Sequence, residues 1–149
     1  MTARVAGALL MALGAALAAL PAFGWYSAPP VGAPTHASGF AGAGQLWVLP
    51  VVGAMTVLSG AALVSARPEG ARETARRVGA LAAVGGAAAL GLALWAATDP
   101  RLDLTVALPG GRETVPAAIT LEAAAIVTPL VAGAILLLGL AVAWAGRRR

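Results

Sequence analysis

The stretch AAAIVTPLVAGAILLLGLAVAWA, residues 123–145, is predominantly apolar and contains no Asp, Glu, Lys or Arg. Because a helix rises about 1.5 Å per residue, about 20 such residues cross a hydrocarbon core of about 30 Å. Three earlier runs have comparable length and composition, at Val5–Phe23, Leu46–Ala66 and Val78–Ala97. The chain is therefore predicted to be an all-α membrane protein, a bundle of four transmembrane helices.

The composition agrees with a single membrane domain over residues 1–149. Hydrophobic residues make up 60% of the chain and charged residues 11%, whereas soluble proteins carry about 25% charged residues. The helices and their loops use the whole length, so no soluble domain of ordinary size remains. The expected helix bounds are about 5–23, 46–66, 78–97 and 118–145.

The same composition excludes several kinds of chemistry. Cysteine is absent, which excludes disulfides, thiolate catalysis and Cys-ligated metals or clusters. The single histidine, His36, excludes an all-His metal site within one chain and is expected to be solvated in a loop. No phosphate-binding loop, dinucleotide fingerprint, zinc-protease motif or nucleophile elbow occurs. We therefore predict no enzyme activity, no catalytic residues, no cofactor and no metal.

The distribution of arginine predicts the orientation of the helices. Of the ten Arg residues, eight lie before the first run, between the second and third runs, or at the end of the chain. Basic loops remain on the cytoplasmic side, so both termini and loop 67–77 are predicted to face the cytoplasm. Loops 24–45 and 98–117 are then predicted to lie on the opposite, exterior side of the cell membrane. The net charge of +4 is assigned to this topology and to anionic lipid head groups, and not to nucleic-acid binding.

The first run has a second interpretation. Arg4, an apolar stretch and the small residues that follow also resemble a signal peptide, which would be cleaved. The stretch is longer than the usual signal-peptide core of about 7–15 residues. We therefore expect it to be retained as a helix.

The loops between the first and second runs, and between the third and fourth, differ in pattern. The first, rich in Pro, Gly and Ser, is predicted to be irregular and exposed. In the second, Leu102–Leu108 alternates apolar and polar residues before Pro109-Gly110-Gly111, which predicts a small extracytoplasmic β-hairpin. The cytoplasmic segment is expected to extend the third helix, with Glu73 and Arg77 spaced as an i,i+4 pair. The four tryptophans are expected to anchor helix ends at the membrane interface: Trp25, Trp47, Trp95 and Trp144.

Small residues indicate where helices pack, because membrane helices associate by close approach of their backbones. In the third run, Gly79, Ala83, Ala87 and Gly91 repeat every four residues and predict one helix-packing face. A similar row, Ala8, Ala12 and Ala16, makes the first helix a candidate neighbour of the third. The abundance of alanine leaves open that either row arises by chance.

Glu122 is the acidic residue closest to an apolar run and is the one candidate functional side chain. It is expected in the first turns of the fourth helix, where the helix dipole stabilises a carboxylate. A role in carrying protons or binding a cation would require polar partners within the bilayer. The sequence offers few such partners: Thr56, Ser59, Thr120 and Thr128.

The layout resembles a family of small four-helix membrane proteins associated with tryptophan-biosynthesis genes of high-GC Gram-positive bacteria. The similar features are Trp25 just beyond the first helix, the segment Gly39–Pro50 that leads into the second helix, the Arg-rich loop before Val78, and basic residues at the end of the fourth helix. The resemblance covers most of the chain at the level of topology. It implies a genomic context and no molecular mechanism.

These observations predict a non-catalytic integral membrane protein, an accessory or structural subunit of a larger membrane complex. Its expected partners are the lipid bilayer and either another membrane protein or further copies of the same chain. The alternative is a small oligomeric transporter or channel, which would require buried polar residues that face a shared axis.

Overall fold

The computed structural model describes residues 2–28, 35–42, 44–98, 103–108, 111–116 and 120–147. Most of it consists of four long helices: α1 (Ala3–Ala19), α3 (Val48–Val64), α4 (Ala71–Thr98) and α5 (Ala123–Ala145). The 3-10 turns η1 (Leu20–Ala22) and η2 (Gly44–Trp47) extend α1 and α3, and a short helix α2 (Gly39–Gly42) precedes η2. When these turns are included, each of the four long helices is long and apolar enough to cross a membrane. The four predicted helices are therefore confirmed.

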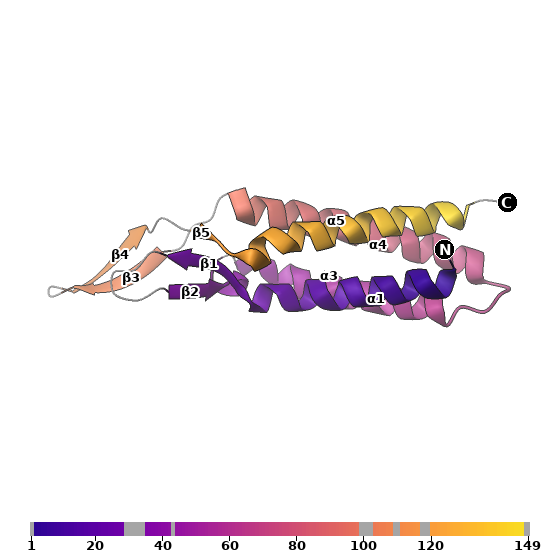
Figure 1. The fold of residues 1–149 in the computed structure, drawn as a ribbon, viewed down its shortest axis with the longest axis horizontal. Coiled ribbons are helices and arrows are strands. Elements are labelled where there is room, and N and C mark those ends of the chain that lie inside the picture. Colours follow the sequence, from indigo (N-terminus) through magenta and orange to yellow (C-terminus); the bar gives the residue numbers. More distant parts are fainter. Residues whose placement is uncertain are drawn as a thin grey trace.

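The helices lie side by side along one axis, and the strands extend beyond them at one end (Figure 1). At the opposite end α1 begins, α3 is joined to α4, and α5 ends (Figure 1). We call the two ends the strand end and the basic end. The basic end carries Arg4, Arg67, Arg72, Arg76, Arg77 and Arg147.

The start of α4 extends two turns before the apolar run at Val78. The charged segment therefore continues the helix, as its pattern predicts. Within it the guanidinium of Arg77 pairs with the carboxylate of Glu73, four residues earlier, and both side chains are exposed.

Glycines seven residues apart bring α1 and α3 together in antiparallel orientation. A Cβ added to Gly7 would lie 2.7 Å from the carbonyl oxygen of Gly60, and one added to Gly14 would lie 2.7 Å from that of Gly53. No side chain fits at these points, so the two backbones are in direct contact. Such contact gives helices the dispersion energy that apolar burial does not supply in lipid.

The second helix pair, α4 and α5, packs in the same way. A Cβ added to Gly86 would lie 2.5 Å from the backbone nitrogen of Leu136, and one added to Gly139 would lie 2.5 Å from that of Ala83. Gly79 lies equally close to Ala143. Three of the long helices therefore carry a pair of glycines at seven-residue spacing, and in α5 the second glycine is the C-cap residue: Gly7 and Gly14, Gly53 and Gly60, Gly79 and Gly86, Gly139 and Gly146.

The four-residue row predicted as one packing face of α4 divides along the helix. Gly79 and Ala83 are buried against α5, but Ala87 and Gly91 are exposed, and a Cβ on Gly91 would meet nothing within 4 Å. Residues four apart rotate by about 40° relative to one another, so three steps turn the row by about 120° away from its neighbour. The buried face follows steps of three and four instead: Val78, Gly79, Ala82, Ala83, Gly86, Ala89, Ala93 and Ala96.

The predicted contact between the first and third apolar runs is wrong. α1 packs mainly on α3 and also on α5, whereas it has little contact with α4. On α1 the expected row is turned outward, since Ala8 and Ala12 are exposed and Gly7 and Gly14 are buried. The glycines allow a closer approach than the alanine row, so they determine the neighbour.

The interior between the two pairs is filled by branched aliphatic side chains. The largest of them are completely or almost completely buried: Leu10, Leu17, Leu49, Leu63 and Ile135. Two buried hydroxyls lie among them, and each donates to its own helix, Thr56 to the Val52 carbonyl and Thr128 to the Ala124 carbonyl. The outer surface of the helices is apolar and bulky, as at Leu58, Val84, Leu130 and Leu137.

Two small sheets form the strand end. β1 (Gly24–Ala28) lies between β2 (Thr35–Ser38) and β5 (Thr120–Leu121), and all pairings are antiparallel. β3 (Asp103–Leu108) pairs with β4 (Gly111–Pro116) in the segment where the alternation predicts a hairpin, while residues 109–110 of the predicted turn lie outside the described residues.

Two sequence-based expectations fail at this end. The first loop contains strands where an irregular segment was expected, and the last helix begins at Ala123 and not at about residue 118. Both differences have one cause. Pairing of Tyr26 with Leu121 and of Ser27 with Thr120 keeps residues 120–121 extended.

Candidate functional site

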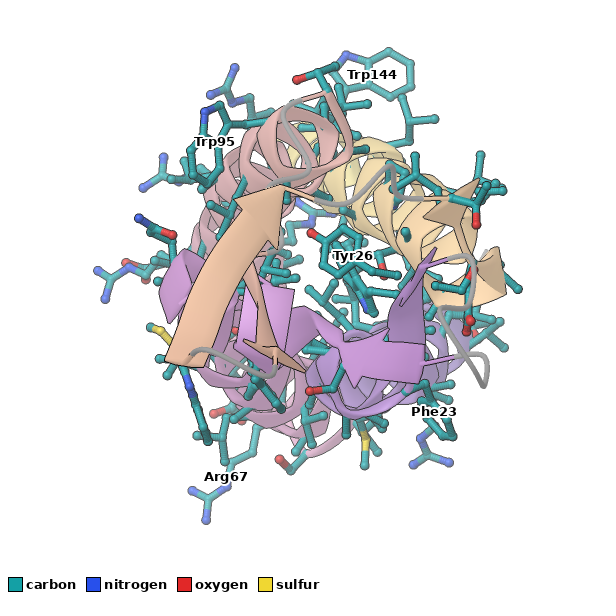
Figure 2. All side chains as sticks on the ribbon, turned by 90° about the vertical axis from the view of Figure 1, so that its left-hand side faces the viewer. Phe23, Tyr26, Arg67, Trp95 and Trp144 are labelled. Atoms are coloured by element: carbon teal, nitrogen blue, oxygen red, sulfur yellow. The ribbon has the colours of Figure 1, made fainter. Side chains whose placement is uncertain are left out.

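β1 closes the strand end of the bundle with two aromatic side chains. Trp25 is 0% and Tyr26 1% exposed, and Figure 2 shows Tyr26 in the middle of the ring of four helices. The indole of Trp25 donates to the Leu20 carbonyl at 2.9 Å, and the hydroxyl of Tyr26 donates to the Ala96 carbonyl at 3.3 Å. Burial raises the pKa of the Tyr26 hydroxyl, so the neutral donor is the stable form.

The position of Trp25 corrects the prediction that all four tryptophans anchor helix ends. Trp47, Trp95 and Trp144 are exposed, whereas the Trp25 ring lies against Gly39 and Leu46. A Cβ added to Gly39 would lie 3.1 Å from atoms of both side chains. The adjacent pair Trp25-Tyr26 signals a strand, because aromatic residues favour strands. Burial of both rings could not be read from it, since successive strand residues point to opposite faces and the register shifts between Gly24 and Tyr26.

Glu122 lies immediately before α5, at its N-cap position, and is partly buried. Its backbone N–H donates to the Trp25 carbonyl at 2.8 Å. Its carboxylate covers the backbone of Gly24 so closely that a Cβ there would overlap a carboxylate oxygen. Glu122 therefore connects β1 to the start of α5, and it lies one residue before the helix and not within its first turns as predicted.

The polar residues expected to assist Glu122 have other partners. Thr120 donates to the Ser27 carbonyl at 3.1 Å, and its hydroxyl lies 2.7 Å from that of Ser27. Thr56 and Thr128 are bonded to their own helices, and Ser59 lines a groove between α3 and α4. The structure brings these hydroxyls into no common pathway.

The potential metal ligands among the described residues lie apart. No three His, Cys, Asp or Glu side chains within them are grouped so that they could hold a metal ion. The backbone of His36 pairs with Ser27 in the sheet, and its side chain lies outside what the structure describes. Among the described residues, the buried side chains with a polar group are Thr56 and Thr128, together with the indole of Trp25 and the hydroxyl of Tyr26.

Comparison with known proteins gives no match to a family model, a curated protein or a solved structure. The function is therefore argued from this chain alone.

Proposed function

We propose that this chain is a non-catalytic, multi-pass protein of the cell membrane that acts as an accessory or structural subunit of a larger membrane complex. One observation carries the proposal. The described interior of the bundle contains aliphatic side chains, two hydroxyls that are bonded to their own helices, and at the strand end the rings of Trp25 and Tyr26, whose polar groups donate to backbone carbonyls. Such an interior offers no site for a reaction and no polar route for an ion.

A transporter or channel is less well supported for the same reason. Ion pathways through a membrane contain ionisable residues that face a cavity or one another, and the described part of each long helix buries none. At the strand end the axis of the bundle is occupied by Tyr26 (Figure 2).

The proposed orientation places the basic end in the cytoplasm, which follows from the preference of arginine for that side. Reporter fusions at Arg72 and Arg149 should then report cytoplasm, and a fusion at Gly110 should report the exterior. An exterior signal from the fusion at Arg149 would contradict the orientation.

Retention of α1 in the mature protein is part of the proposal. Gly7 and Gly14 on α1 fit the backbone of α3, and the side chains of Leu10 and Leu17 are fully buried. Cleavage after α1 would expose this face of α3 to lipid. The intact mass of the purified protein should include residues 3–22, and a mass without them would contradict retention.

The exposed part of the small-residue row on α4 provides a test for the partner. Leu at Gly91 meets open space, so Gly91→Leu should leave the bundle folded while it blocks the close approach of a second helix. We expect a stoichiometric membrane-protein partner to copurify in mild detergent with the wild type, and less of it with Gly91→Leu. Leu137→Ile, on the exposed face of α5, is the control. A protein that purifies alone and monomeric from its native membrane would contradict the accessory role.

The resemblance to the family associated with tryptophan-biosynthesis genes stays a prediction. It is compatible with an accessory role and adds no residue to it.

A further inference from the structure

The basic end contains a cavity. Its volume is about 390 Å³, and residues from all four long helices line it. It exists because most of the lining side chains are very small, such as Ala6, Ala71, Ala75 and Ala145. At the strand end the corresponding space is filled by Trp25 and Tyr26.

The lining of the cavity is apolar inside and polar at one edge. Ala6, Leu63 and Val142 form its buried wall, while Trp144 and Ala145 on the exposed side of α5 line its mouth. Ordered water needs two to four polar partners, and the buried wall offers no polar side chain. The volume lies within the range of about 300–1,000 Å³ that is typical of ligand sites. The cavity therefore suits an apolar chain better than water.

Arg72 stands at the edge of this cavity and also at the edge of an adjoining hollow. The second hollow is lined by Arg72, Glu73, Arg76 and Gly146, so it shares Arg72 and Gly146 with the first. The Glu73 carboxylate is paired with Arg77. Within the part of the chain that the structure describes, no ion pair involves Arg72 or Arg76. These two guanidinium groups, beside the mouth of an apolar cavity, are therefore not neutralised by any described carboxylate and can bind an anion.

We propose that the basic end is a binding site for an anionic phospholipid, with one acyl chain in the cavity and the phosphate on Arg72 and Arg76. The occupant follows from charge complementarity, because a basic pocket between helices at the cytoplasmic interface selects anionic head groups. The inference rests on the proposed insertion in the membrane and is independent of the accessory role.

Native mass spectrometry of the full chain in detergent tests the site, with phosphatidylglycerol and phosphatidylcholine of identical acyl chains as probes. We expect at least about tenfold stronger retention of phosphatidylglycerol, since a tenfold ratio is a modest preference for two charge-assisted contacts. The double substitution Arg72→Gln with Arg76→Gln should abolish the preference. The double substitution Arg4→Gln with Arg67→Gln, which also removes two charges from the basic end at residues that line neither hollow, should keep it.

Two further arms separate the acyl chain from the head group. Ala75→Leu, which fills the cavity, should weaken retention of both lipids, and circular dichroism should confirm that the variant is folded. Glycerol phosphate, which has a phosphate and no acyl chain, should not displace the bound lipid. Equal retention of the two lipids by the wild type, an unchanged preference in the double variant, or displacement by glycerol phosphate would each overturn the proposal. Resistance of the protein to alkaline extraction from membranes tests the insertion separately, so the two failures are distinguishable.

Discussion

Two glycines on α4, Gly86 and Gly91, lie in opposite environments although only five residues separate them. Gly86 touches the backbone of Leu136, and Gly91 has open space where a side chain would begin. At the scale of single residues, the position of a glycine relative to its neighbour helix decides its effect. The same residue type is a packing contact at one position and a free surface at the other.

Leucine substitutions at these two positions form a matched pair. Gly86→Leu places a side chain where two backbones meet, and we expect a loss of about 1–3 kcal/mol or more in the free energy of unfolding, as in overpacked cores. Gly91→Leu should leave it unchanged or raise it by up to about 1 kcal/mol, because glycine is a poor helix former. Thermal unfolding in detergent measures both. Equal loss in the two variants would contradict the packing described for α4.

Tyr26 is the single tyrosine of the chain, so its ionisation can be followed by phenolate absorbance without interference. Burial raises its pKa above the ordinary value of 10.0, and the folded state therefore holds the proton more tightly than the unfolded state. Its contribution to stability is complete below pH 10 and is lost as the pH rises from there through the raised pKa. We expect the phenolate to appear at higher pH in folded than in unfolded protein.

Tyr26→Phe is the variant that accompanies this titration. It removes the hydrogen bond to the Ala96 carbonyl, at an expected cost of about 0.5–1.5 kcal/mol. The decline of stability above pH 10 should become shallower in this variant. A tyrosine that titrates at the same pH in folded and unfolded protein would place the ring outside the bundle.

At the scale of elements, the pairing of β1 with β5 positions the start of α5. Ser27 and Thr120 are 93 residues apart in sequence, and their hydroxyl oxygens lie 2.7 Å apart. Glu122 follows directly, and its N–H bonds the Trp25 carbonyl. This pairing replaces the first turn that the sequence predicted for the helix.

Cysteines at these two positions should form a disulfide, because opposed residues of antiparallel strands lie within the Cα separation that a disulfide bridges. The chain has no native cysteine, so Ser27→Cys with Thr120→Cys reports this contact alone. Oxidation should produce a species with faster mobility on a non-reducing gel. Ser27→Cys with Thr98→Cys, at an exposed site at the end of α4, is the control. If the last helix instead began at residue 118, Ser27→Cys with Thr120→Cys would form no disulfide, and that result would contradict the pairing of β1 with β5.

The elements differ in how far the sequence predicts them. The long helices are predictable because length and absence of charge suffice, and the extension of α4 follows from its i,i+4 pair. The packing partners of α1 and α4 could not be predicted from the alanine rows, since rows such as Ala8 and Ala12 occur on several faces of an alanine-rich helix. The seven-residue glycine spacing was visible in three helices, and in the fourth between Gly139 and the residue after its end, and it indicates the correct faces.

Local sequence patterns could not predict that Trp25 and Tyr26 close the strand end of the bundle. Burial of Trp25 depends on Gly39 and Leu46, and the position of Tyr26 depends on Ala96. Such contacts join segments that are distant in sequence, and they leave no periodic pattern from which they could be predicted. Glu122 was predicted within the first turns of the last helix, and it lies one residue before that helix; its packing on Gly24 was not predictable.

At the scale of the whole molecule, two glycine-packed pairs, α1 with α3 and α4 with α5, enclose an aliphatic interior. Aromatic rings close it at the strand end, and a cavity opens at the basic end (Figures 1 and 2). The buried wall of that cavity carries no charge, and Thr56 and Thr128 use their hydroxyls within their own helices. Such a molecule is expected to act by its surfaces and not by conduction.

Flux of protons and cations into liposomes that contain the purified protein tests this claim most directly. The closed interior predicts no flux above that of empty liposomes, both for the wild type and for Glu122→Gln. The substitution should be tolerated structurally, because a carboxylate at a helix start contributes about 0.3–1 kcal/mol through the dipole. Robust flux through the wild type that Glu122→Gln abolishes would contradict the accessory role and establish the transporter.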